Sequence, residues 1–374
     1  LFLVCDEVTE LCIKSFTNKR KIVIISETYQ TSDTSDLFAG GSVSDRERGV
    51  FMREIEELSQ YLENDKVRGL RKALGRDIQE KLSKSGIYFH IFSRLKSAGS
   101  IWHKLEWKKD EYMEKDKKLQ DLIGIRIVLY YMDDVPICKE LLKETYSIIE
   151  KDSHEDIPKV NEFNPIRMNY VCRMPEEISS AFPRGLWENY RIDKTFEVQV
   201  RTTFSEGWHE VDHDVRYKHK EEWEEHYEFS RELNGIYATL EICDRSMVNL
   251  LERLAYKNYK NMQIEAMLRN KFRLRFENPV LSVPLMEFLQ KDQDLVKKLY
   301  RADREDPILF FASGYSEGIP LTVDNLVLVC NELQLGRKDL EERTPMLIRE
   351  KTGQWKEKKR EKQEKNPENV QKVV

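Results

Sequence analysis

The chain has 374 residues, of which 40% are hydrophobic and 34% are charged, and its formal net charge is −5. This composition predicts a globular protein with one large or two medium domains and a very polar surface. The acidic balance argues against a whole-protein electrostatic grip on DNA or on an anionic membrane. No apolar run approaches the ~20 residues that a membrane-spanning helix needs, so no membrane partner is expected.

Residues 1–45 are expected to be an N-terminal segment and linker with a truncated start, because they lack an initiator Met and a secretory signal. They contain one β-branched run, residues 21–26, followed by a stretch rich in Ser, Thr, Asp and Gly. The six cysteines are scattered, without a C-x-x-C pair or a closely spaced histidine. A disulfide framework and a zinc site are therefore not expected, and a reducing, cytoplasmic compartment is.

The next elements alternate between helical and strand patterns. Residues 45–84 have apolar residues at helical spacing, which Gly86 ends. Strands are predicted at 87–92, 125–131, 167–173 and 195–201, and helices at 96–109, 134–150 and through much of 204–259. This order predicts an α+β fold, with a mixed β-sheet flanked by helices in a domain spanning residues 46–255. Residues 256–350 form a predicted C-terminal helical region, and residues 351–374 a charged tail that is either a frayed helix or disordered.

A basic segment follows the first strand of this domain. Lys96, Ser100 and Lys104 are four residues apart and would lie on one face of the predicted helix. Two ammonium groups and a hydroxyl near a helix N-terminus could bind a polyphosphate. A solvated basic face fits the same spacing.

Acidic residues mark two of the predicted strands. Asp121 lies where a helix ends and a strand begins, a suitable position for a Mg²⁺ ligand or for an ordinary turn residue. Glu197, Gln199 and Arg201 alternate along the last strand and would share one face, opposite a core face. This face could be an ordinary wet surface or one wall of a metal and phosphate cleft. The helix after it carries His213, but no other histidine cluster completes a metal phosphohydrolase site.

Taken together and in this order, these elements resemble the synthetase domain of the RelA/SpoT alarmone enzymes. That family's pattern is R-x-K-x₃-S-x₃-K, then D-x-x-G-x-R, then E-x-Q-x-R-T, then a helix ending in R/K-Y-K. The matching segments are Arg94–Lys104, Asp121–Arg126, Glu197–Thr202 and Arg216–Lys218. The resemblance covers roughly a third of the chain and implies a nucleotidyltransferase-like sheet.

The resemblance also implies a role for each matching residue. Arg94 and Arg126 would bracket the adenine of ATP, and Lys96, Ser100 and Lys104 would hold its triphosphate. Asp121 and Glu197 would bind Mg²⁺ or Mn²⁺, and Glu197 would help to take the proton of the attacking hydroxyl. Arg201 would complete the catalytic set, and Gln199 and His213 would face the acceptor.

The acceptor motif departs from the family. The usual P-K-x-N-G-Y-x-S-L/I-H is replaced by Pro158-Lys-Val-Asn-Glu-Phe-Asn-Pro-Ile-Arg167, so a phenylalanine stands in place of the base-stacking tyrosine. The candidates for a rebuilt acceptor site are Lys159, Asn161, Phe163 and Arg167. A guanosine nucleotide, another nucleotide and a tRNA 3′ end all remain open as acceptors.

The activity implied is ATP-dependent transfer of a diphosphate to a ribose 3′-hydroxyl. Because no hydrolase domain is apparent, a toxin or stress effector restrained by residues 256–350 is one hypothesis, and an inhibitory partner or a homo-oligomer is also open. Two alternatives are an idle ATP-sensing module and a nucleotidyltransferase of related fold, although the paired D-x-D of the latter is missing. A purely structural protein would leave the four ordered motifs as coincidence.

Overall fold

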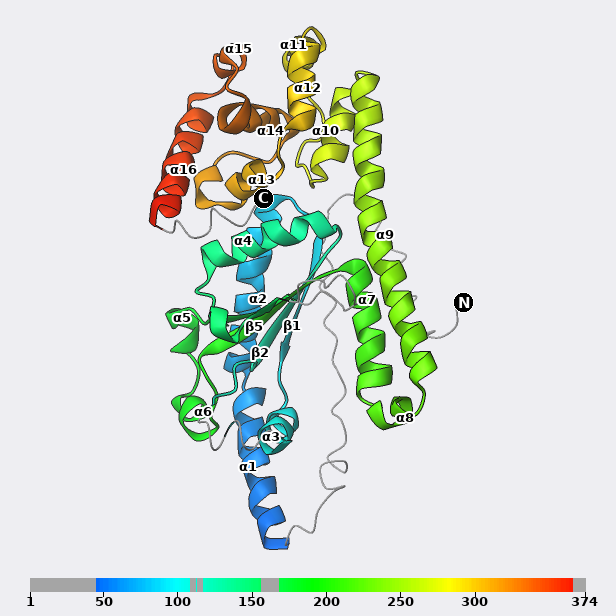
Figure 1. Ribbon diagram of the computed structural model, residues 1–374. Coiled ribbons are helices and arrows are strands. Elements are labelled where there is room, and N and C mark those ends of the chain that lie inside the picture. The colour runs from blue at the N-terminus through cyan, green and yellow to red at the C-terminus, as the bar shows by residue number, and fades with distance from the viewer. Residues whose placement is uncertain (1–44, 108–111, 113–116, 156–167, 366–374) are drawn as a thin grey trace, which may run out of the picture. The chain divides into compact units, whose positions relative to one another are not determined.

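The computed structural model describes residues 45–107, 112, 117–155 and 168–365. In this part of the chain a sheet has the strand order β1-β2-β5-β4-β3. Its strands are β1 Phe89–Leu95, β2 Ile123–Leu129, β3 His154–Glu155, β4 Met168–Arg173 and β5 Thr195–Thr202. β2 and β5 are parallel and the other pairs antiparallel. The predicted α+β class, with a mixed sheet among helices, is confirmed (Figure 1).

Helices precede and separate these strands. They are α1 Asp45–Glu63, α2 Asp65–Ser85, α3 Ala98–Trp107, η3 Met132–Asp134, α4 Val135–Thr145, η4 Glu150–Asp152, α5 Glu176–Ser179 and α6 Arg184–Asn189. α1 and α2 confirm the helical prediction for residues 45–84. Gly86 ends α2 in the left-handed region at φ 74°, and its N–H donates to the carbonyl of Ser83. A side chain would be strained there, which explains the glycine.

The sheet has one core face and one polar face, as the alternation in β5 predicts. Ile125 and Ile127 of β2 pair with Val198 and Val200 of β5, and all four are 2% exposed or less. The core face meets α2 and α4 through the ring of Tyr146, which packs edge-on against Phe196 and donates a hydrogen bond to Asp77 of α2. The polar face is therefore held by a close-packed layer behind it.

Several predicted boundaries differ from the observed ones. The first strand runs to Leu95 because its ladder with β2 continues to the pair Leu95 and Ile123. The helix predicted at 134–150 ends at Thr145, since Tyr146 turns to an extended conformation and places its ring in the core. The two-residue strand β3 is absent from the sequence prediction because it is too short for a pattern.

A helical hairpin follows β5. It consists of α7 Thr203–Val211, the π-helical segment η5 Asp212–Tyr217, α8 Lys220–Glu224 and α9 Tyr227–Lys260. Thr202 is the N-cap of α7, and its hydroxyl accepts a hydrogen bond from the N–H of Ser205. The same hydroxyl donates a hydrogen bond to Asp244 of α9. α9 crosses residue 255, where the predicted domain boundary lies, as one continuous helix.

Asp244 makes stability depend on pH. Burial raises its pKa to about 6, and the nearby Glu241 adds to this. A carboxyl whose pKa is raised by folding stabilises the fold below the unfolded pKa, near 4, and loses that contribution as the pH rises through 6. Asp244→Asn is therefore expected to increase the free energy of unfolding by about 1–2 kcal/mol at pH 8 and by less at pH 5. Urea unfolding at both pH values tests this, and an equal effect at both would contradict it.

The C-terminal helices pack against the end of β2. They are α10 Ile264–Phe272, α11 Val283–Gln290, α12 Gln293–Arg301, α13 Glu305–Ala312, η6 Gly314–Ser316, α14 Val323–Cys330, η7 Asn331–Leu335, α15 Lys338–Glu341 and α16 Met346–Lys365. Arg304 donates to Asp133 at 2.6 Å and to Asp134 at 2.7 Å, and Arg273 also binds Asp133. Asp134 is fully buried. Removing one partner of a buried ion pair leaves the charge of the other partner uncompensated. These ion pairs therefore stabilise the packing of the C-terminal helices against the end of β2.

The charged tail is helical further than predicted. α16 continues to Lys365, and residues 366–374 lie outside the described residues. Ile348, Thr352 and Trp355 lie on one side of α16 and are buried. The prediction overlooked this i, i+4, i+7 spacing because the surrounding residues are mostly lysine and glutamate. No helix of the described residues combines the length and the hydropathy that crossing a membrane requires.

Candidate active site

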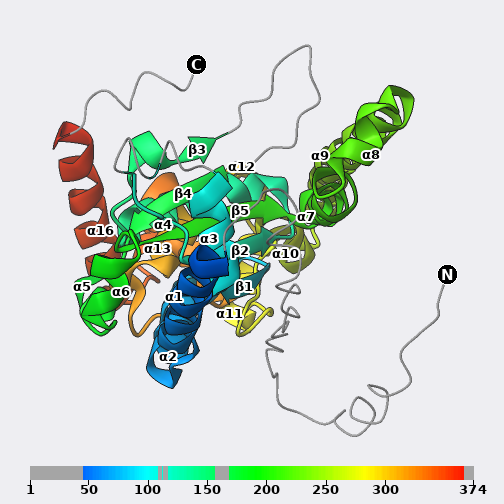
Figure 2. The same cartoon turned by 90° about the horizontal axis from the view of Figure 1, so that it is seen from below.

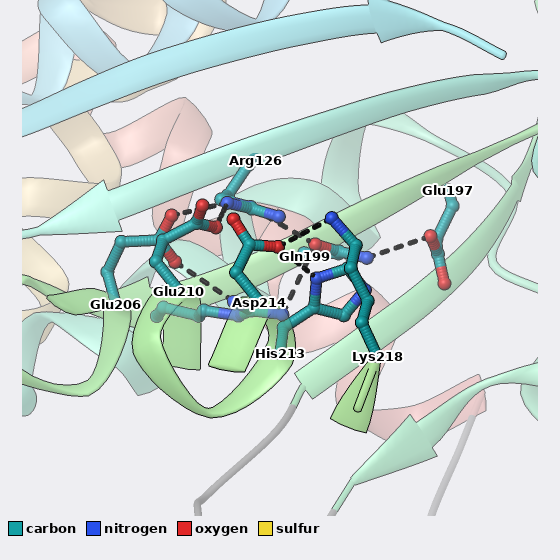
Figure 3. A network of polar contacts seen from close by, with 9 residues as sticks. Arg126, Glu197, Gln199, Glu206, Glu210, His213, Asp214 and Lys218 are labelled. Carbon is teal, nitrogen blue, oxygen red and sulfur yellow. Dashed lines mark hydrogen bonds and ion pairs between the residues drawn. The ribbon is translucent and has the colours of Figure 1, made fainter. Parts of the chain in front are cut away.

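The polar face of the sheet collects two of the predicted motifs because β2 and β5 are parallel neighbours. Their register places Gly124 beside Glu197 and Arg126 beside Gln199. Residues paired in this way point to the same face of a sheet. Segments that are 73 residues apart in the sequence, counted from Arg126 to Gln199, therefore form one surface (Figure 3).

Asp121 lies just before β2 and binds both predicted phosphate-binding lysines. Its Oδ2 accepts hydrogen bonds from Lys96 Nζ at 2.6 Å and from Lys104 Nζ at 2.8 Å. Burial by itself would raise the pKa of Asp121, but the two ammonium groups outweigh burial and lower the pKa. Because two cations share one anion, the cluster can attract a further anionic group.

The two lysines respond differently to this shared partner. Burial, together with the neighbouring cations Lys104 and Arg94, lowers the pKa of Lys96, although Asp121 acts in the opposite direction. Burial also opposes the charge of Lys104, but there Asp121 prevails and the pKa of Lys104 is raised, with a smaller contribution from Glu197.

The start of α3 corrects one prediction. The hydroxyl of Ser97 accepts a hydrogen bond from the N–H of Ser100 at 3.2 Å and donates to the Ser100 hydroxyl at 2.8 Å. Ser97 thus caps the helix, and Lys96 precedes it. The prediction that Lys96 shares a helical face with Ser100 and Lys104 is wrong, because Lys96 joins Lys104 through Asp121 instead. Ser100 lies in the first turn, where the helix favours anions.

Arg94 belongs to β1, which is the neighbour of β2 in the sheet. It is paired with Gly124, and a Cβ atom at Gly124 would lie 3.4 Å from Cγ and Nε of the arginine. The glycine of the D-x-x-G-x-R segment therefore leaves room for the Arg94 side chain on the polar face. Any larger residue would compete with Arg94 for the same space.

Carboxylates from α7 hold Arg126. Its Nη1 donates to Glu206 at 2.5 Å and also to Glu210, and its Nε donates to Gln199 Oε1 at 3.2 Å (Figure 3). Burial opposes the charge, but the carboxylates prevail and raise the pKa of Arg126. These contacts occupy the edge of the guanidinium group, so its flat face is the part that suits stacking on an aromatic ligand.

Gln199 connects Arg126 to Glu197. Its amide NH₂ donates to Glu197 Oε2 at 3.0 Å, while its carbonyl accepts from Arg126 and, at 3.3 Å, from Arg201. The residues that the sequence analysis missed are Glu206 and Glu210. Their i, i+4 spacing directly after β5 was the available signal, since it places both on the side of α7 that meets the sheet.

Arg201 is buried in the same network. Its side chain is 3% exposed and donates to Glu206 at 3.0 Å and to Gln199. Burial and the neighbouring Arg126 lower the pKa of Arg201 to about 10. A side chain enclosed in this way can orient Glu206 and Gln199. The catalytic role expected for Arg201 stays a prediction.

Residues 93–222 match a family model described as a region found in RelA / SpoT proteins. This segment contains every one of the residues just described. Residues 93–222, called the RelA/SpoT region below, are similar to this family over about a third of the chain. The resemblance expected from the four ordered motifs is thereby confirmed.

Two curated relatives of this RelA/SpoT region come from Bacillus subtilis (strain 168). GTP pyrophosphokinase YwaC is 27% identical over 134 residues, which is 34% of this chain and 58% of that protein. GTP pyrophosphokinase YjbM is 25% identical over 129 residues, 34% of this chain and 56% of the other. The chain thus matches a little more than half the length of each. The crystal structure of the small alarmone synthetase 1 from Bacillus subtilis has a TM-score of 0.35 and 20% identity, over 55% of this chain and 96% of that one.

The RelA/SpoT region contains groups that suit a divalent cation. Asp121 Oδ1 is buried and accepts no hydrogen bond, although its Oδ2 accepts two. Among the described residues no group of three or more His, Cys, Asp or Glu side chains could hold a metal by itself. Mg²⁺ commonly takes one or two protein carboxylates and completes its shell with phosphates and water. Asp121 and Glu197 are ligands of the type that such an ion takes, and their joint binding of a metal stays a prediction.

A cavity of about 760 Å³ lies beside α3. Its lining joins α3 to the helical hairpin and consists of His103, Asp212, Arg216, Tyr217, Lys218, Lys220, Trp223, Glu224, Tyr227 and Ser230. The aromatic and cationic members of this set suit a nucleobase with attached phosphates. The sequence analysis missed Trp223 and Tyr227, because no sequence motif indicates that they line one cavity with His103 of α3.

The predicted acceptor residues have different outcomes. The ring of His213 stacks on Tyr217 with centroids 5.7 Å apart, and its Nδ1 is 2.9 Å from Asp214. Its neighbour Tyr217 lines the cavity, whereas Gln199 lies in the sheet network. Lys159, Asn161, Phe163 and Arg167 lie outside the described residues. Their part in acceptor binding stays a prediction.

Proposed function

We propose that the RelA/SpoT region transfers the β,γ-diphosphate of ATP to a ribose 3′-hydroxyl. The observation that carries this proposal is the pairing of Lys96 and Lys104 on Asp121, next to the network that holds Glu197. The lysines supply positive charge for a triphosphate, and the carboxylates supply metal ligands. The names of the two curated relatives support a guanosine nucleotide as acceptor.

In the proposed step the acceptor 3′-oxygen forms a bond to the β-phosphorus, and the bond from that phosphorus to the bridging oxygen of the α-phosphate breaks. AMP leaves with the bridging oxygen and its electron pair, and Glu197 takes the proton of the hydroxyl. Such a transfer depends on in-line placement and on neutralising charge. A Mg²⁺ ion at Asp121 and Glu197 would add positive charge at the phosphates.

The donor and the acceptor would occupy different parts of the region. Stacking of adenine on the flat faces of Arg94 and Arg126 would direct the triphosphate toward Lys96 and Lys104. The cavity lined by Tyr217 and other aromatic residues is then available for the acceptor base. A free guanosine nucleotide and the terminal adenosine of a tRNA each present a purine base with attached phosphate, which the aromatic and cationic residues of this lining suit.

The experiment is product analysis with γ-labelled ATP, Mg²⁺ and separate pools of GDP, GTP, ATP alone and tRNA. The proposal predicts that one pool gains label and that AMP is released in equal amount. Label in free pyrophosphate with AMP attached to the acceptor would mean a nucleotidyltransferase. Absence of AMP from every pool would mean an idle nucleotide-binding module. Either of these outcomes overturns the proposal.

Gly124→Val tests the proposed donor site. The added methyl groups would displace Arg94 from the polar face, so we expect the KM for ATP to rise about tenfold, or ~1.4 kcal/mol. The value of kcat at saturating ATP and the melting temperature should change little, because valine is well accepted in a strand. Steady-state kinetics with the smaller Gly124→Ala change as a graded comparison provide the check. An unchanged KM in both variants would argue against a role of Arg94 in ATP binding.

The restraint of activity by residues 256–350 remains part of the same proposal, as does a role as a toxin or stress effector in the cytoplasm. Truncation after residue 255 would remove Arg273 and Arg304 from the buried Asp134 and its neighbour Asp133. It would also cut through α9. Single substitutions on the surface of α13 are therefore a better test of restraint than truncation.

A further inference from the structure

β4 carries a further polar side chain on the face of the proposed site. Asn169 lies opposite Gln199 of β5 in the antiparallel register, and Val171 lies opposite Glu197. Directly opposite residues of paired strands project to the same side of the sheet. Tyr170, between them, projects to the other side and is fully buried in the core. Asn169 therefore belongs to the polar face.

The amide of Asn169 has an oxygen without a partner. Its Oδ1 is buried and accepts no hydrogen bond within the described part of the chain. The neighbouring Gln199 does not supply one, because its NH₂ group donates to Glu197 and its carbonyl accepts hydrogen bonds from two arginines. A buried carbonyl oxygen without a hydrogen bond is unfavourable and rare in proteins. A ligand that donates a hydrogen bond at this place would satisfy it.

The strand order separates Asn169 from the proposed donor site. Figure 2 shows β1, β2, β5, β4 and β3 following one another across the sheet. Arg94 and Arg126, the residues proposed to stack on adenine, belong to β1 and β2. Asn169 belongs to β4, on the opposite side of the strand that carries Glu197. A ligand group at Asn169 is therefore on the acceptor side of Glu197.

The distance between Asn169 and Glu197 suits one particular group of the acceptor. The two residues are diagonal neighbours across the strand pair, a relation in which the Cα atoms are about 7–8 Å apart. Their side chains can thus reach adjacent atoms of one ligand. In the proposed reaction the ribose 3′-hydroxyl lies at Glu197, and the 2′-hydroxyl is on the adjacent carbon atom. A hydroxyl can donate a hydrogen bond to an amide oxygen.

We propose that Asn169 binds the 2′-hydroxyl of the acceptor ribose, so that ribonucleotide acceptors are selected over their 2′-deoxy counterparts. This inference rests on the proposed transfer to a ribose 3′-hydroxyl, and it gives a role to a residue outside the four ordered motifs. The hydrogen bond to Oδ1 also orients the ribose for in-line attack. Because a guanosine nucleotide and the terminal adenosine of a tRNA both contain the 2′-hydroxyl, the selection applies to either acceptor.

Acceptors that differ only at the 2′ position provide the test. The acceptor that gains label, GDP or tRNA, is compared with 2′-deoxy-GDP or with tRNA that ends in 2′-deoxyadenosine. In the parent chain we expect kcat/KM to be about tenfold lower for the deoxy acceptor, because a hydrogen bond is lost and a buried oxygen stays unpaired. Asn169→Val removes the amide and is well accepted in a strand. It should reduce the ratio of the two kcat/KM values to about twofold or less.

The outcomes separate this inference from the proposed function. Transfer with equal kcat/KM for both acceptors in the parent chain, or an unchanged ratio in Asn169→Val, overturns the role of Asn169 and leaves the proposed reaction intact. Absence of transfer to every acceptor overturns the proposed reaction and this inference with it.

Two further variants distinguish the hydrogen bond from a change in folding. Asn249→Val is the matched control, because it removes an amide from an exposed position of α9 and should keep the ratio of the parent chain. Asn169→Asp keeps an oxygen that accepts a hydrogen bond at the same place. Its preference for the ribonucleotide should therefore persist, even where kcat is lower. Loss of the preference in either of these variants would contradict the proposed hydrogen bond.

Discussion

Replacing Glu197 with glutamine should lower kcat for diphosphate transfer by about 10³-fold or more, which corresponds to ~4 kcal/mol of barrier. The substitution removes a negative charge and a proton acceptor but preserves the shape of the side chain. Gln199 can still donate its hydrogen bond to the remaining amide oxygen. The fold should therefore be intact, and the loss should appear in kcat. The measurement is the rate of AMP release at saturating ATP and acceptor.

Glu177→Gln is the matched control for this result. Glu177 lies on the short helix α5 of the same domain and is exposed. The control should retain the activity of the parent chain. If Glu197→Gln also retained activity to within a factor of ten, Glu197 would have no place in the chemical step, and the proposed catalytic pair would fail.

Asp121→Asn is expected to separate ATP binding from chemistry. The substitution removes the anion that Lys96 and Lys104 share, so both ammonium groups become available for the triphosphate. Binding of ATP without metal should be as tight as before or tighter. At the same time kcat should fall by about 10³-fold, because a metal ligand is lost. Isothermal titration in EDTA and steady-state rates in Mg²⁺ measure the two effects.

Asp294→Asn is a control that also removes a carboxylate paired with a lysine. Asp294 lies 3.1 Å from Lys298 on the exposed side of α12, far from the polar face in sequence. It should change neither ATP binding nor kcat. An Asp121 variant that lost ATP binding together with activity would show that Asp121 positions the lysines and nothing more.

The sequence carries information about individual strands and little about their neighbours. The period of two in β5 predicts correctly that Glu197 and Gln199 share a polar face with a core face behind them, because alternation is a local property. The parallel pairing of β5 with β2 joins segments that are far apart in the sequence, and no local sequence pattern indicates it. Only that pairing places Gln199 against Arg126. The resemblance to a known family suggested that the two segments lie together, and the register of β2 and β5 explains how they do.

The same distinction explains the errors around Lys96. Four-residue spacing is evidence for a shared helical face only where a helix exists, and Ser97 starts α3 after Lys96. Lys96 and Lys104 nevertheless lie close together, because both donate hydrogen bonds to Asp121. The sequence shows that these three residues are charged, but it does not show that they pair with one another.

Helical positions far from the motifs were underestimated for a related reason. Glu206 and Glu210 look like ordinary surface residues until α7 is placed over the sheet, where both meet Arg126. Trp355 looks isolated among charges until α16 packs, and it is then 6% exposed.

The binding of Mn²⁺ in the presence of a non-hydrolysable ATP analogue tests the central arrangement most directly. Electron paramagnetic resonance distinguishes protein-bound Mn²⁺ from free Mn²⁺ without any turnover. The parent chain should bind one ion with the analogue, and Glu197→Gln and Asp121→Asn should each weaken that binding by 10-fold or more. Equal Mn²⁺ affinity in the parent chain and both variants would contradict a shared ion at these two carboxylates.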